Sequence, residues 1–376
     1  MVDGIPVLEV VVSTHMGGGP QHVYTVATGL RARGFAPTVA GPRDGAMAET
    51  FEAAGIELVD LPTHRLRPDL VLRLARLIAG RRIRLVHSHG KGAGVYGRLA
   101  ARLAGVPALH TFHGLHFERY PPGVRHAYLA LERRLSAWTY AVVNVSRAQE
   151  AEGLAHRLFG AAQSRVIPNG IDLASLADRA LSRAQARARL GVPQRSMVVG
   201  CAARFDPVKA HALLMEAVGR VLDPDLRLVL VGTGIEERRL RARARAEDLR
   251  GRVLFAGEIP DAACVFRAFD LYASTSTKEG LPLAVLEAMA LGLPVVATDI
   301  AGHRELFADG TSALVAPTAA AIARAIDVLA ADGERRRALG ADNRARARRF
   351  DAASMLEATE CLYREALGLV RCHGCP

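Results

Sequence analysis

Short apolar runs alternate with longer helical patterns along the first half of the chain. The runs are rich in Val, Ile and Leu and end in turn residues, which predicts strands; they span 7–13, 36–41, 83–88, 107–112, 140–145 and 164–169. The segments between them carry apolar residues three and four positions apart, which predicts helices; they span 20–33, 69–80, 92–104, 124–138 and 147–158. This alternation predicts an α/β fold with a doubly wound parallel sheet.

A second series begins beyond the turn-rich stretch "PNGID" at 168–172. Its predicted strands span 196–203, 226–232, 252–257, 270–275, 294–298 and 312–316, and its predicted helices span 182–190, 209–221, 235–247, 282–291 and 318–331. Because 376 residues exceed one typical domain, we predict two domains, residues 1–175 and 176–350. A final helix is expected in 351–376; it either caps the second sheet or packs back on the first domain.

Composition and charge narrow the class of protein. Half of the residues are hydrophobic and 23% are charged, which is ordinary for a globular protein. The net charge of +11 accompanies an arginine-rich composition. An anionic partner and a bias in amino-acid usage explain this charge equally well. Aromatic residues make up 5%, and no zinc-finger, RNA-recognition or helix-turn-helix signature is found, which disfavours nucleic acid.

The N-terminus, "MVDGIPVLEVVVSTH", predicts a first strand. It carries an acid at Asp3 and no basic stretch, unlike a signal peptide. No apolar run reaches the roughly 18 to 20 residues of a spanning helix. We therefore expect a soluble or peripheral protein in the cytoplasm.

Cysteine usage disfavours both a disulfide framework and a metal centre. Five cysteines are spread over the chain, unlike a small secreted scaffold. Cys372, His373 and Cys375 share the tail "RCHGCP", but no second pair of zinc ligands accompanies them.

Glycines follow the first predicted strand, in "STHMGGGPQHVY". Gly17, Gly18 and Gly19 predict a tight turn whose backbone N–H groups suit a phosphate, although a close turn alone would use glycine too. A dinucleotide fingerprint would place glycine where His22 stands and an acid at the end of the second strand, where only Asp44 follows in the loop. NAD is therefore disfavoured.

Histidines stand at the ends of two further predicted strands. In "FHG", His113 lies just past a strand end, at the edge where parallel sheets bind ligands, and a packed histidine is the alternative. His87 and His89 hold a similar position and are weaker candidates.

In the second domain, "CAARFDPVKAH" places Arg204 just beyond a strand and Lys209 five residues later. Two cations at the carboxyl end of a parallel strand predict a diphosphate clamp, whereas either alone is more typical of a solvated surface. Gly232 and Gly234 in "VGTGIEERRL" are assigned a steric role, letting a ligand or a neighbouring loop approach. No G-x-S-x-G elbow or Walker lysine loop is present.

Two carboxylates flank a predicted anion site in "STKEGLPLAVLEAMALGLP", residues 276–294. Pro282 begins the helical pattern and Gly292 ends it, so the helix N-terminus suits an anion. Glu279 precedes that N-terminus and Glu287 follows eight residues later. Carboxylates repel phosphate but accept hydrogen bonds from paired hydroxyls. A ligand that has phosphates between two polyols is a nucleotide sugar, so we expect the site to bind one.

These motifs together resemble the retaining GT-B glycosyltransferases of family 4, the capsule, exopolysaccharide and lipopolysaccharide group. Glu279 and Glu287 match the family's E-x-seven-E signature, Arg204 and Lys209 its basic pair, "RVIPNGID" its inter-domain strand, and "GGPQHVYTVATGLRARG" its first glycine loop and helix. The similarity runs from about residue 6 to 367. It implies two Rossmann-like domains facing across a cleft.

The resemblance also implies roles for individual residues. Glu287 would accept from ribose hydroxyls, Arg204 and Lys209 would neutralise the diphosphate, and Glu279 would hold hydroxyls of the donor sugar. Backbone groups would contact the donor at Gly18, Gly19, Gly280, Leu281, Pro282 and Leu283. His113 would lie beside the donor sugar. No cofactor or metal is implied, and the family retains anomeric configuration.

The expected acceptor is a glycan or a polyprenyl-linked saccharide, because "LVHSHGKGAGVYGRLAARLAGVPALHTFHGLHF" is similar to the surface-polysaccharide enzymes. Residues 61–104 hold ten Lys or Arg against one acid, and 69–80 is amphipathic, which predicts either peripheral contact with an anionic membrane or a core-facing helix with a solvated basic side. A nucleotide-sugar 2-epimerase of the same architecture is the alternative function, and a silent sugar-nucleotide binder is a third.

Overall fold

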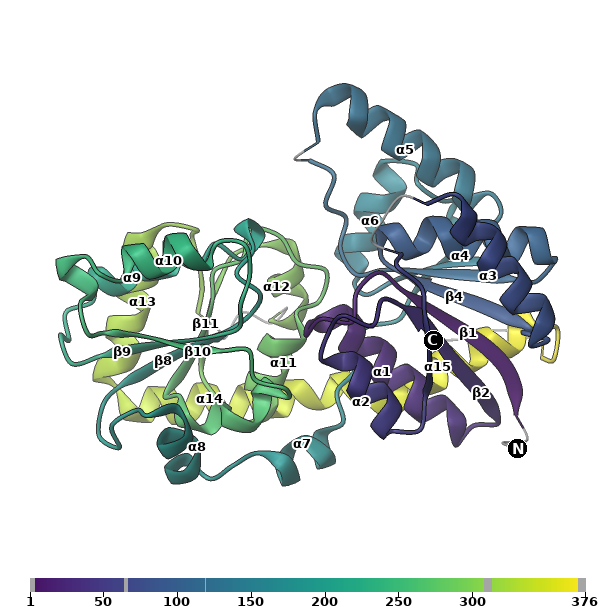
Figure 1. The fold of residues 1–376 in the computed structure, drawn as a ribbon. Coiled ribbons are helices and arrows are strands. Elements are labelled where there is room, and N and C mark those ends of the chain that lie inside the picture. Colours follow the sequence, from purple (N-terminus) through teal and green to yellow (C-terminus); the bar gives the residue numbers. More distant parts are fainter. Residues whose placement is uncertain (1–3, 64–66, 119, 308–312, 371–376) are drawn as a thin grey trace. The chain divides into compact units, whose positions relative to one another are not determined.

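The computed structural model describes residues 4–63, 67–118, 120–307 and 313–370, and it contains two compact units (Figure 1). The first unit comprises residues 1–170 together with 352–376, and the second comprises residues 171–351. The final helix, whose partner the sequence leaves open, therefore belongs to the first unit.

Seven parallel strands build the sheet of the first unit, in the order β3-β2-β1-β4-β5-β6-β7. The strands are β1 (Ile5–Val11), β2 (Phe35–Gly41), β3 (Glu57–Asp60), β4 (Leu85–His89), β5 (Ala108–Phe112), β6 (Ala141–Asn144) and β7 (Ser164–Val166). The helices are α1 (Gly18–Arg31), α2 (Met47–Ala53), α3 (Asp69–Gly80), α4 (Lys91–Ala104), α5 (Pro122–Ser136), α6 (Arg147–Ala155) and α15 (Ala352–Ala366).

Helices cover both faces of this sheet (Figure 1). Because successive side chains of a strand point to opposite faces, Leu8 and Val10 of β1 join a core with α3 and α4. Val7 of the same strand joins a second core with α1 and α15. The almost continuous apolar run of β1 is thus explained by burial on both sides.

The first unit contains two elements that the hydrophobic pattern does not predict, β3 and α2. β3 has four residues at the edge of the sheet, and only Leu58 among them is buried. α2 has seven residues. Elements this short carry too few buried positions to show a period.

Helix α3 buries its apolar side inside the protein. Leu70, Leu74 and Ile78 lie in the core that also includes α4. This is the core-facing alternative of the two that the sequence leaves open for 69–80, so these residues are not available to a membrane. Of the helices described, none is both long enough and apolar enough to cross a bilayer.

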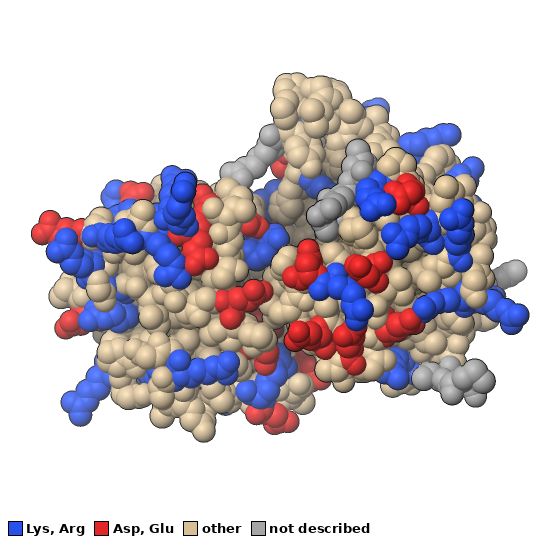
Figure 2. Space-filling model, in the orientation of Figure 1, with Lys and Arg blue, Asp and Glu red and all other residues tan. Residues whose placement is uncertain are grey.

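The basic segment 61–104 is not uniformly exposed. Arg98, one of its ten cations, is completely buried against Glu132 of α5, so it adds nothing to the charge of the surface. Arg67 and Arg81 pair with Asp69 and Glu57. Figure 2 shows Lys and Arg interspersed with Asp and Glu on the visible face of both units.

Six parallel strands form the second sheet, in the order β10-β9-β8-β11-β12-β13. They are β8 (Val198–Ala202), β9 (Arg227–Val231), β10 (Val253–Gly257), β11 (Leu271–Ser274), β12 (Val295–Thr298) and β13 (Ala313–Val315). The helices are α7 (Leu173–Arg179), α8 (Arg183–Leu190), α9 (His211–Gly219), α10 (Glu237–Arg243), α11 (Leu283–Ala290), α12 (Ala301–Leu306), α13 (Ala319–Ala331) and α14 (Gly333–Ala347).

The pattern misses three helices of the second unit, α7, α12 and α14. α7 and α12 have seven and six residues. α14 has fifteen, but its sequence "GERRRALGADNRARA" is polar on most sides, and only Gly340, Asn343 and Ala347 are buried. A small residue at a packed position leaves no hydrophobic period to detect.

Each sheet reverses its winding at one pair of strands, β1 with β4 in the first and β8 with β11 in the second. In open α/β sheets, ligands bind outside the carboxyl ends of the strands at this switch point, because the loops diverge there and leave room. The candidate residues of both units follow these four strands or lie on the elements that adjoin them.

The buried ion pair between α4 and α5 leads to a stability prediction. Nη2 of Arg98 donates to Oε2 of Glu132 at 2.6 Å, and both side chains are fully buried. Glu132→Ala leaves the guanidinium buried without its counter-charge, so we expect a loss of about 3–5 kcal/mol of unfolding free energy. Chemical denaturation measures it. Glu57→Ala, which breaks the exposed pair with Arg81, should cost less than about 1 kcal/mol; equal losses would contradict the assignment.

Candidate functional site

Two loops lie side by side at the carboxyl edge of the second sheet, one after β8 and one after β11. The backbone N–H of Thr277 donates to the carbonyl of Val208 at 2.8 Å. Oγ1 of Thr275 donates to the carbonyls of Lys209 and Ala210 at 3.2 and 3.1 Å. These bonds hold the loop that carries Lys209 against the loop that carries Glu279.

Lys209 and Glu279 form the centre of this arrangement. Nζ of Lys209 donates to Oε1 of Glu279 at 2.6 Å, and Oγ of Ser276 donates to the same oxygen at 2.6 Å. Burial acts to raise the pKa of Glu279, but the Lys209 charge and the two hydrogen bonds outweigh it and hold that pKa below its usual value. Glu279 is therefore an ionised hydrogen-bond acceptor with a cation beside it.

Helix α12 supports this centre, and sequence reasoning missed it. A Cβ on Gly302 would lie 2.5 Å from the carbonyl oxygen of Glu279, so only glycine lets the helix approach so closely. His303 is buried; its Nδ1 donates to the carbonyl of Thr298 at 2.7 Å, so its Nε2 accepts from Ser274 at 3.0 Å. The adjacent glycine and histidine in "AGHRE" are the signal that could have indicated the role.

Arg204 is the exposed cation of this edge. Its side chain is 57% exposed, and Nη2 contacts Oδ2 of Asp206 at 2.7 Å. Lys209, at 23%, is much less exposed. The predicted basic pair thus consists of one residue held inside the site and one reaching into solvent.

The N-terminus of α11 lies beside Glu279. Gly280, Leu281 and Pro282 connect the loop to Leu283, the first helical residue. Pro282, where the helix is predicted to start, occupies the N-cap position, so the helix begins one residue later than predicted, and no side chain caps it. Its first-turn N–H groups are those that an anion could accept from.

Glu287 lies farther along α11, and its environment differs from that of Glu279. Burial raises the pKa of Glu287 to about 7; the charge of Arg179 acts against this rise and that of Asp261 adds to it. The closest approach of Arg179 Nη2 to Glu287 Oε1 is 4.0 Å. Glu287 therefore lacks a close cation.

Gly232 and Gly234, after β9, have the steric role that the sequence suggests. Both have positive φ, and a Cβ at Gly232 would lie 2.2 Å from the carbonyl oxygen of Ala203. At Gly234 it would lie 2.7 Å from backbone atoms of Phe205. What approaches these glycines is the loop that carries Arg204.

In the first unit, Gly18 and Gly19 open α1, and Gly19 lies beside His113. Gly17 is the N-cap and no side chain caps the helix. A Cβ on Gly19 would lie 3.7 Å from Cδ2 of His113. The structure therefore brings the predicted glycines and the predicted histidine of this unit together.

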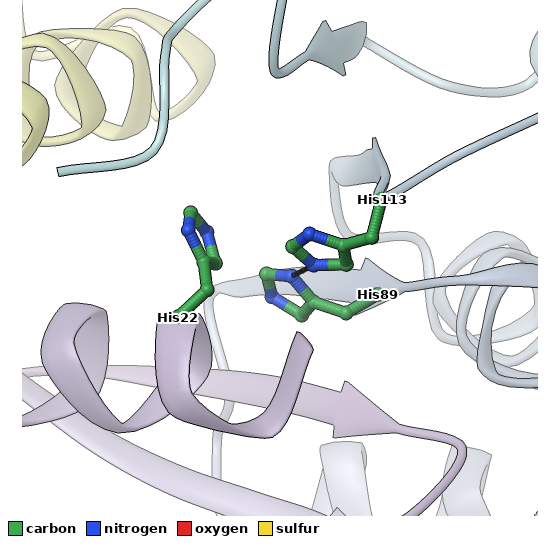
Figure 3. A group of neighbouring side chains, drawn as sticks. All are labelled: His22, His89 and His113. Carbon is green, nitrogen blue, oxygen red and sulfur yellow. Dashed lines mark hydrogen bonds between the residues drawn. The ribbon is translucent and has the colours of Figure 1, made fainter. Parts of the chain in front are cut away.

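His113 belongs to a cluster of histidines at the β1/β4 switch point (Figure 3). His22 projects from α1 toward His89 at the end of β4 and His113 after β5. Nδ1 of His89 and Nε2 of His113 are 3.2 Å apart. Burial lowers the pKa of His22 to about 4 and places those of His89 and His113 well below the usual value, so all three rings are neutral near pH 7.

Two groups in the described part of the first unit could hold a metal ion: His22 with His89 and His113, and Glu9 with His87 and His89. Their ligand atoms lie within 4.8 Å of one another. The 3.2 Å between His89 and His113 is close to the roughly 3.3 Å edge expected for zinc–nitrogen bonds of about 2.0–2.1 Å. It is equally a hydrogen-bond distance. Cys372, His373 and Cys375 lie outside the described residues.

The pKa of Glu287 leads to a prediction about pH. Its folded value of about 7 lies above the ordinary 4.5, so the carboxyl contributes most to stability below pH 4.5, and that contribution is lost as pH rises through 7. Glu287→Gln removes the charge. Without nucleotide, it should leave the unfolding temperature near wild type at pH 5 and raise it by a few degrees at pH 8.

Differential scanning calorimetry at both pH values measures this effect. Glu216→Gln, at an exposed ion pair with Arg220, is the matched control and should show no such pH dependence. An unfolding temperature for Glu287→Gln that follows wild type at every pH would contradict the raised pKa.

Two family models match the chain in succession. The model described as Glycosyltransferase Family 4 matches residues 16–175, and the model described as Glycosyl transferases group 1 matches residues 182–346. The first match begins after β1 and includes β2 to β7, and the second includes β8 to β13.

Characterised relatives are similar along much of the chain. The UDP-Gal:alpha-D-GlcNAc-diphosphoundecaprenol alpha-1,3-galactosyltransferase of Escherichia coli is 30% identical over 241 residues, which cover 62% of this chain and 62% of that protein. The D-inositol 3-phosphate glycosyltransferase of Saccharomonospora viridis is 34% identical over 76% of this chain and 71% of its own. The phosphatidyl-myo-inositol mannosyltransferase of Mycobacterium tuberculosis is 30% identical over 89% of both.

Solved structures show the same fold. Anabaena HepE, in complex with UDP and glucose, matches 96% of this chain and 100% of its own with a TM-score of 0.85 and 24% identity. The sucrose-phosphate synthase of Thermosynechococcus elongatus matches 97% and 100% with a TM-score of 0.83 and 24% identity. The predicted fold class, two Rossmann-like domains of the GT-B type, is confirmed.

Proposed function

The chain belongs to the family 4, group 1 glycosyltransferases, and on that premise we propose that it transfers a hexose-type sugar from a nucleotide-diphosphate sugar to a glycan or lipid-linked saccharide. The observation that carries this proposal is the Lys209–Glu279 contact of 2.6 Å beside the uncapped N-terminus of α11. A cation and helix N–H groups suit a diphosphate, and an adjoining ionised carboxylate suits sugar hydroxyls.

The two cations have distinct tasks in this proposal. Lys209 is already ordered against Glu279, so little side-chain entropy is lost when it contacts a phosphate. Arg204 is exposed and can close on the diphosphate with its planar guanidinium. Together they stabilise the negative charge that develops as the diphosphate leaves.

The carboxylates bind the two ends of the donor. Glu279 accepts hydrogen bonds from hydroxyls of the transferred sugar, and Glu287 accepts from the ribose. The backbone from Gly280 to Leu283 lies between them in sequence and offers the phosphates the amide groups of the loop and the helix start. A bound ribose would supply Glu287 with the hydrogen-bond donors that its buried surroundings provide only in part.

In the first unit, the backbone of Gly18 and Gly19 is proposed to contact phosphate or sugar. The His113 imidazole is proposed to contact a hydroxyl of the donor sugar. Gly19 adjoins His113 in the structure, so a single ligand could touch both.

We propose that transfer retains the anomeric configuration. The acceptor hydroxyl attacks on the face from which the diphosphate departs, a leaving phosphate oxygen takes its proton, and the glycosidic bond forms as the sugar–phosphate bond breaks. No protein nucleophile, metal or other cofactor takes part. The protein holds the reactants in place and stabilises the departing charge.

The relatives support particular substrates. The name of the Escherichia coli enzyme includes a UDP-sugar donor and a diphosphoundecaprenol-linked acceptor, and HepE was solved with UDP. We therefore propose a UDP-sugar donor, a polyprenyl-linked saccharide acceptor and a role in cell-surface polysaccharide synthesis. The protein would work in the cytoplasm at the inner face of the plasma membrane, where exposed cations of residues 61–104 would contact anionic lipid.

A panel of nucleotide sugars tests the donor. One UDP-sugar should raise the unfolding temperature and be hydrolysed slowly to UDP when no acceptor is present, without EDTA changing the rate. An acceptor should accelerate UDP release, and NMR of the product should show the donor's anomeric configuration. No response to any UDP-sugar would refute the donor, and a 2-epimer formed without acceptor would establish the epimerase alternative.

Substitutions test the residue roles. Glu279→Gln should reduce turnover by roughly 10- to 1000-fold, a few kcal/mol of transition-state stabilisation, while nucleotide binding largely survives. Arg204→Ala should weaken binding and turnover together. Glu216→Gln, an exposed carboxylate on α9, should change neither. Steady-state kinetics with calorimetric nucleotide binding measures all three, and wild-type rates for the first two would show that the site is misassigned.

A further inference from the structure

A continuous chain of hydrogen bonds runs beneath His113. Oε1 of Glu9 on β1 accepts from the hydroxyl of Tyr363 on α15 at 2.6 Å. Its other oxygen, Oε2, lies 2.7 Å from Nε2 of His89, whose Nδ1 is the atom 3.2 Å from Nε2 of His113. Glu9, His89 and Tyr363 are buried, so water cannot take over these roles.

The side branch of this chain has one consistent pattern of donors. The single proton of the Tyr363 hydroxyl goes to Glu9, so that hydroxyl accepts from Nδ1 of His87 at 2.7 Å. Nε2 of His87 is then bare and accepts from the hydroxyl of Thr111 at 2.7 Å. Every polar atom in the branch has a partner while Glu9 remains a carboxylate.

Burial raises the pKa of Glu9, and the hydrogen bond from Tyr363 acts against that rise. With Glu9 ionised, the main branch has a fixed direction as well: a carboxylate can only accept, so Nε2 of His89 carries the proton and donates to Glu9. Because His89 is neutral, its Nδ1 is bare and can only accept, and the proton between the rings must belong to Nε2 of His113. His113 in turn has no proton left for Nδ1.

We propose that Glu9 and His89 are positioning residues for His113: they hold its imidazole in the tautomer that is protonated on Nε2 and leave Nδ1 as a hydrogen-bond acceptor. Nδ1 of His113 makes no hydrogen bond to any residue that the structure describes, and His113 is partly exposed. The group that this nitrogen recognises is a hydroxyl, which donates, rather than a carbonyl or phosphate oxygen. The identification of that hydroxyl as part of a sugar rests on the proposed function.

The hydrogen bonds that link Tyr363, Glu9, His89 and His113, together called the relay below, account for this cluster without a metal ion. Glu9, His87 and His89 are all satisfied by hydrogen bonds among themselves and with Tyr363 and Thr111. Only His22 departs from this pattern, since its Nδ1 is buried without a partner among the described residues. A metal at His89 and His113 would have to displace the proton that joins them.

The tautomer can be observed directly in the full-length protein. Long-range proton–nitrogen NMR of histidine-labelled protein separates protonated from bare ring nitrogens, and His113→Gln assigns the signals. We expect His113 to be protonated on Nε2 in the wild type. Protonation on Nδ1, or a mixture of the two tautomers, would overturn the proposal, and this readout does not depend on transferase activity.

Glu9→Gln should reverse the relay while keeping its shape. The introduced amide can accept from Tyr363 only through its oxygen, which turns its NH2 group toward His89. Nε2 of His89 must then accept, its Nδ1 donates to His113, and the His113 proton moves to Nδ1. Glu150→Gln, which makes the same change at a carboxylate bonded to Ser164 in the same unit, is the matched control and should leave the tautomer unchanged.

Kinetics shows whether the tautomer matters for transfer. Glu9→Gln should lower kcat by roughly 10- to 100-fold, because Nδ1 of His113 would then carry a proton and the sugar hydroxyl would have to change from donor to acceptor to keep the contact. Glu150→Gln should keep the wild-type kcat. If the tautomer reverses and kcat is unchanged, the relay is supported and the proposed contact between His113 and the sugar is refuted. An unchanged tautomer in a folded Glu9→Gln protein would refute the relay.

A zinc titration separates the relay from a metal site. It uses Cys372→Ser/Cys375→Ser protein, so that the C-terminal thiols cannot bind the ion. We expect no stoichiometric shift of the His22, His89 and His113 signals. One equivalent of zinc that shifts all three would overturn the relay in favour of a three-histidine metal site.

Discussion

The candidate sites of both units depend on parallel strand pairing. This pairing, between β1 and β4 and between β8 and β11, brings the carboxyl ends of neighbouring strands to one edge of each sheet. The loops after β8 and β11 are far apart in sequence, yet their backbones hydrogen-bond, and Lys209 meets Glu279 for that reason. In the first unit, the same geometry places His89 at the end of β4 close to Glu9 of β1 and to His113 beyond β5. Without parallel register, these groups would be distributed over both edges.

Three buried carboxyl groups, those of Glu279, Glu287 and Glu9, have three different surroundings. Glu279 has a direct cation in Lys209, which keeps it ionised. Glu287 has only Arg179 at 4.0 Å, and its pKa rises to about 7. Burial raises the pKa of Glu9 too, and the hydrogen bond from Tyr363 acts against that rise. The neighbouring charges and hydrogen bonds, and not burial alone, therefore set the pKa of each carboxyl group.

How much could be predicted depended on the length of each element and on the number of apolar side chains it buries. Helix 69–80 was predicted with its observed bounds because Leu70, Leu74 and Ile78 repeat at helical spacing. The polar α14 and the six-residue α12 carry no such repeat, although α12 brings Gly302 against Glu279. The residues of the candidate site in the second unit were named from motifs, whereas their supports Ser276 and His303 were not. Hydrogen bonding to a neighbouring loop leaves no periodic signal in a sequence.

The sequence by itself determined the alternation of strands and helices, the presence of two sheets, and the residues that carry charge or glycine flexibility after each strand. Those features follow from side-chain period and backbone conformation, which are local properties. Only the tertiary structure decided that Tyr363, near the end of the chain, hydrogen-bonds with Glu9 on the first strand. It alone also decided that Arg98 is buried and Arg204 exposed, because burial depends on which segments pack together and not on the residue type.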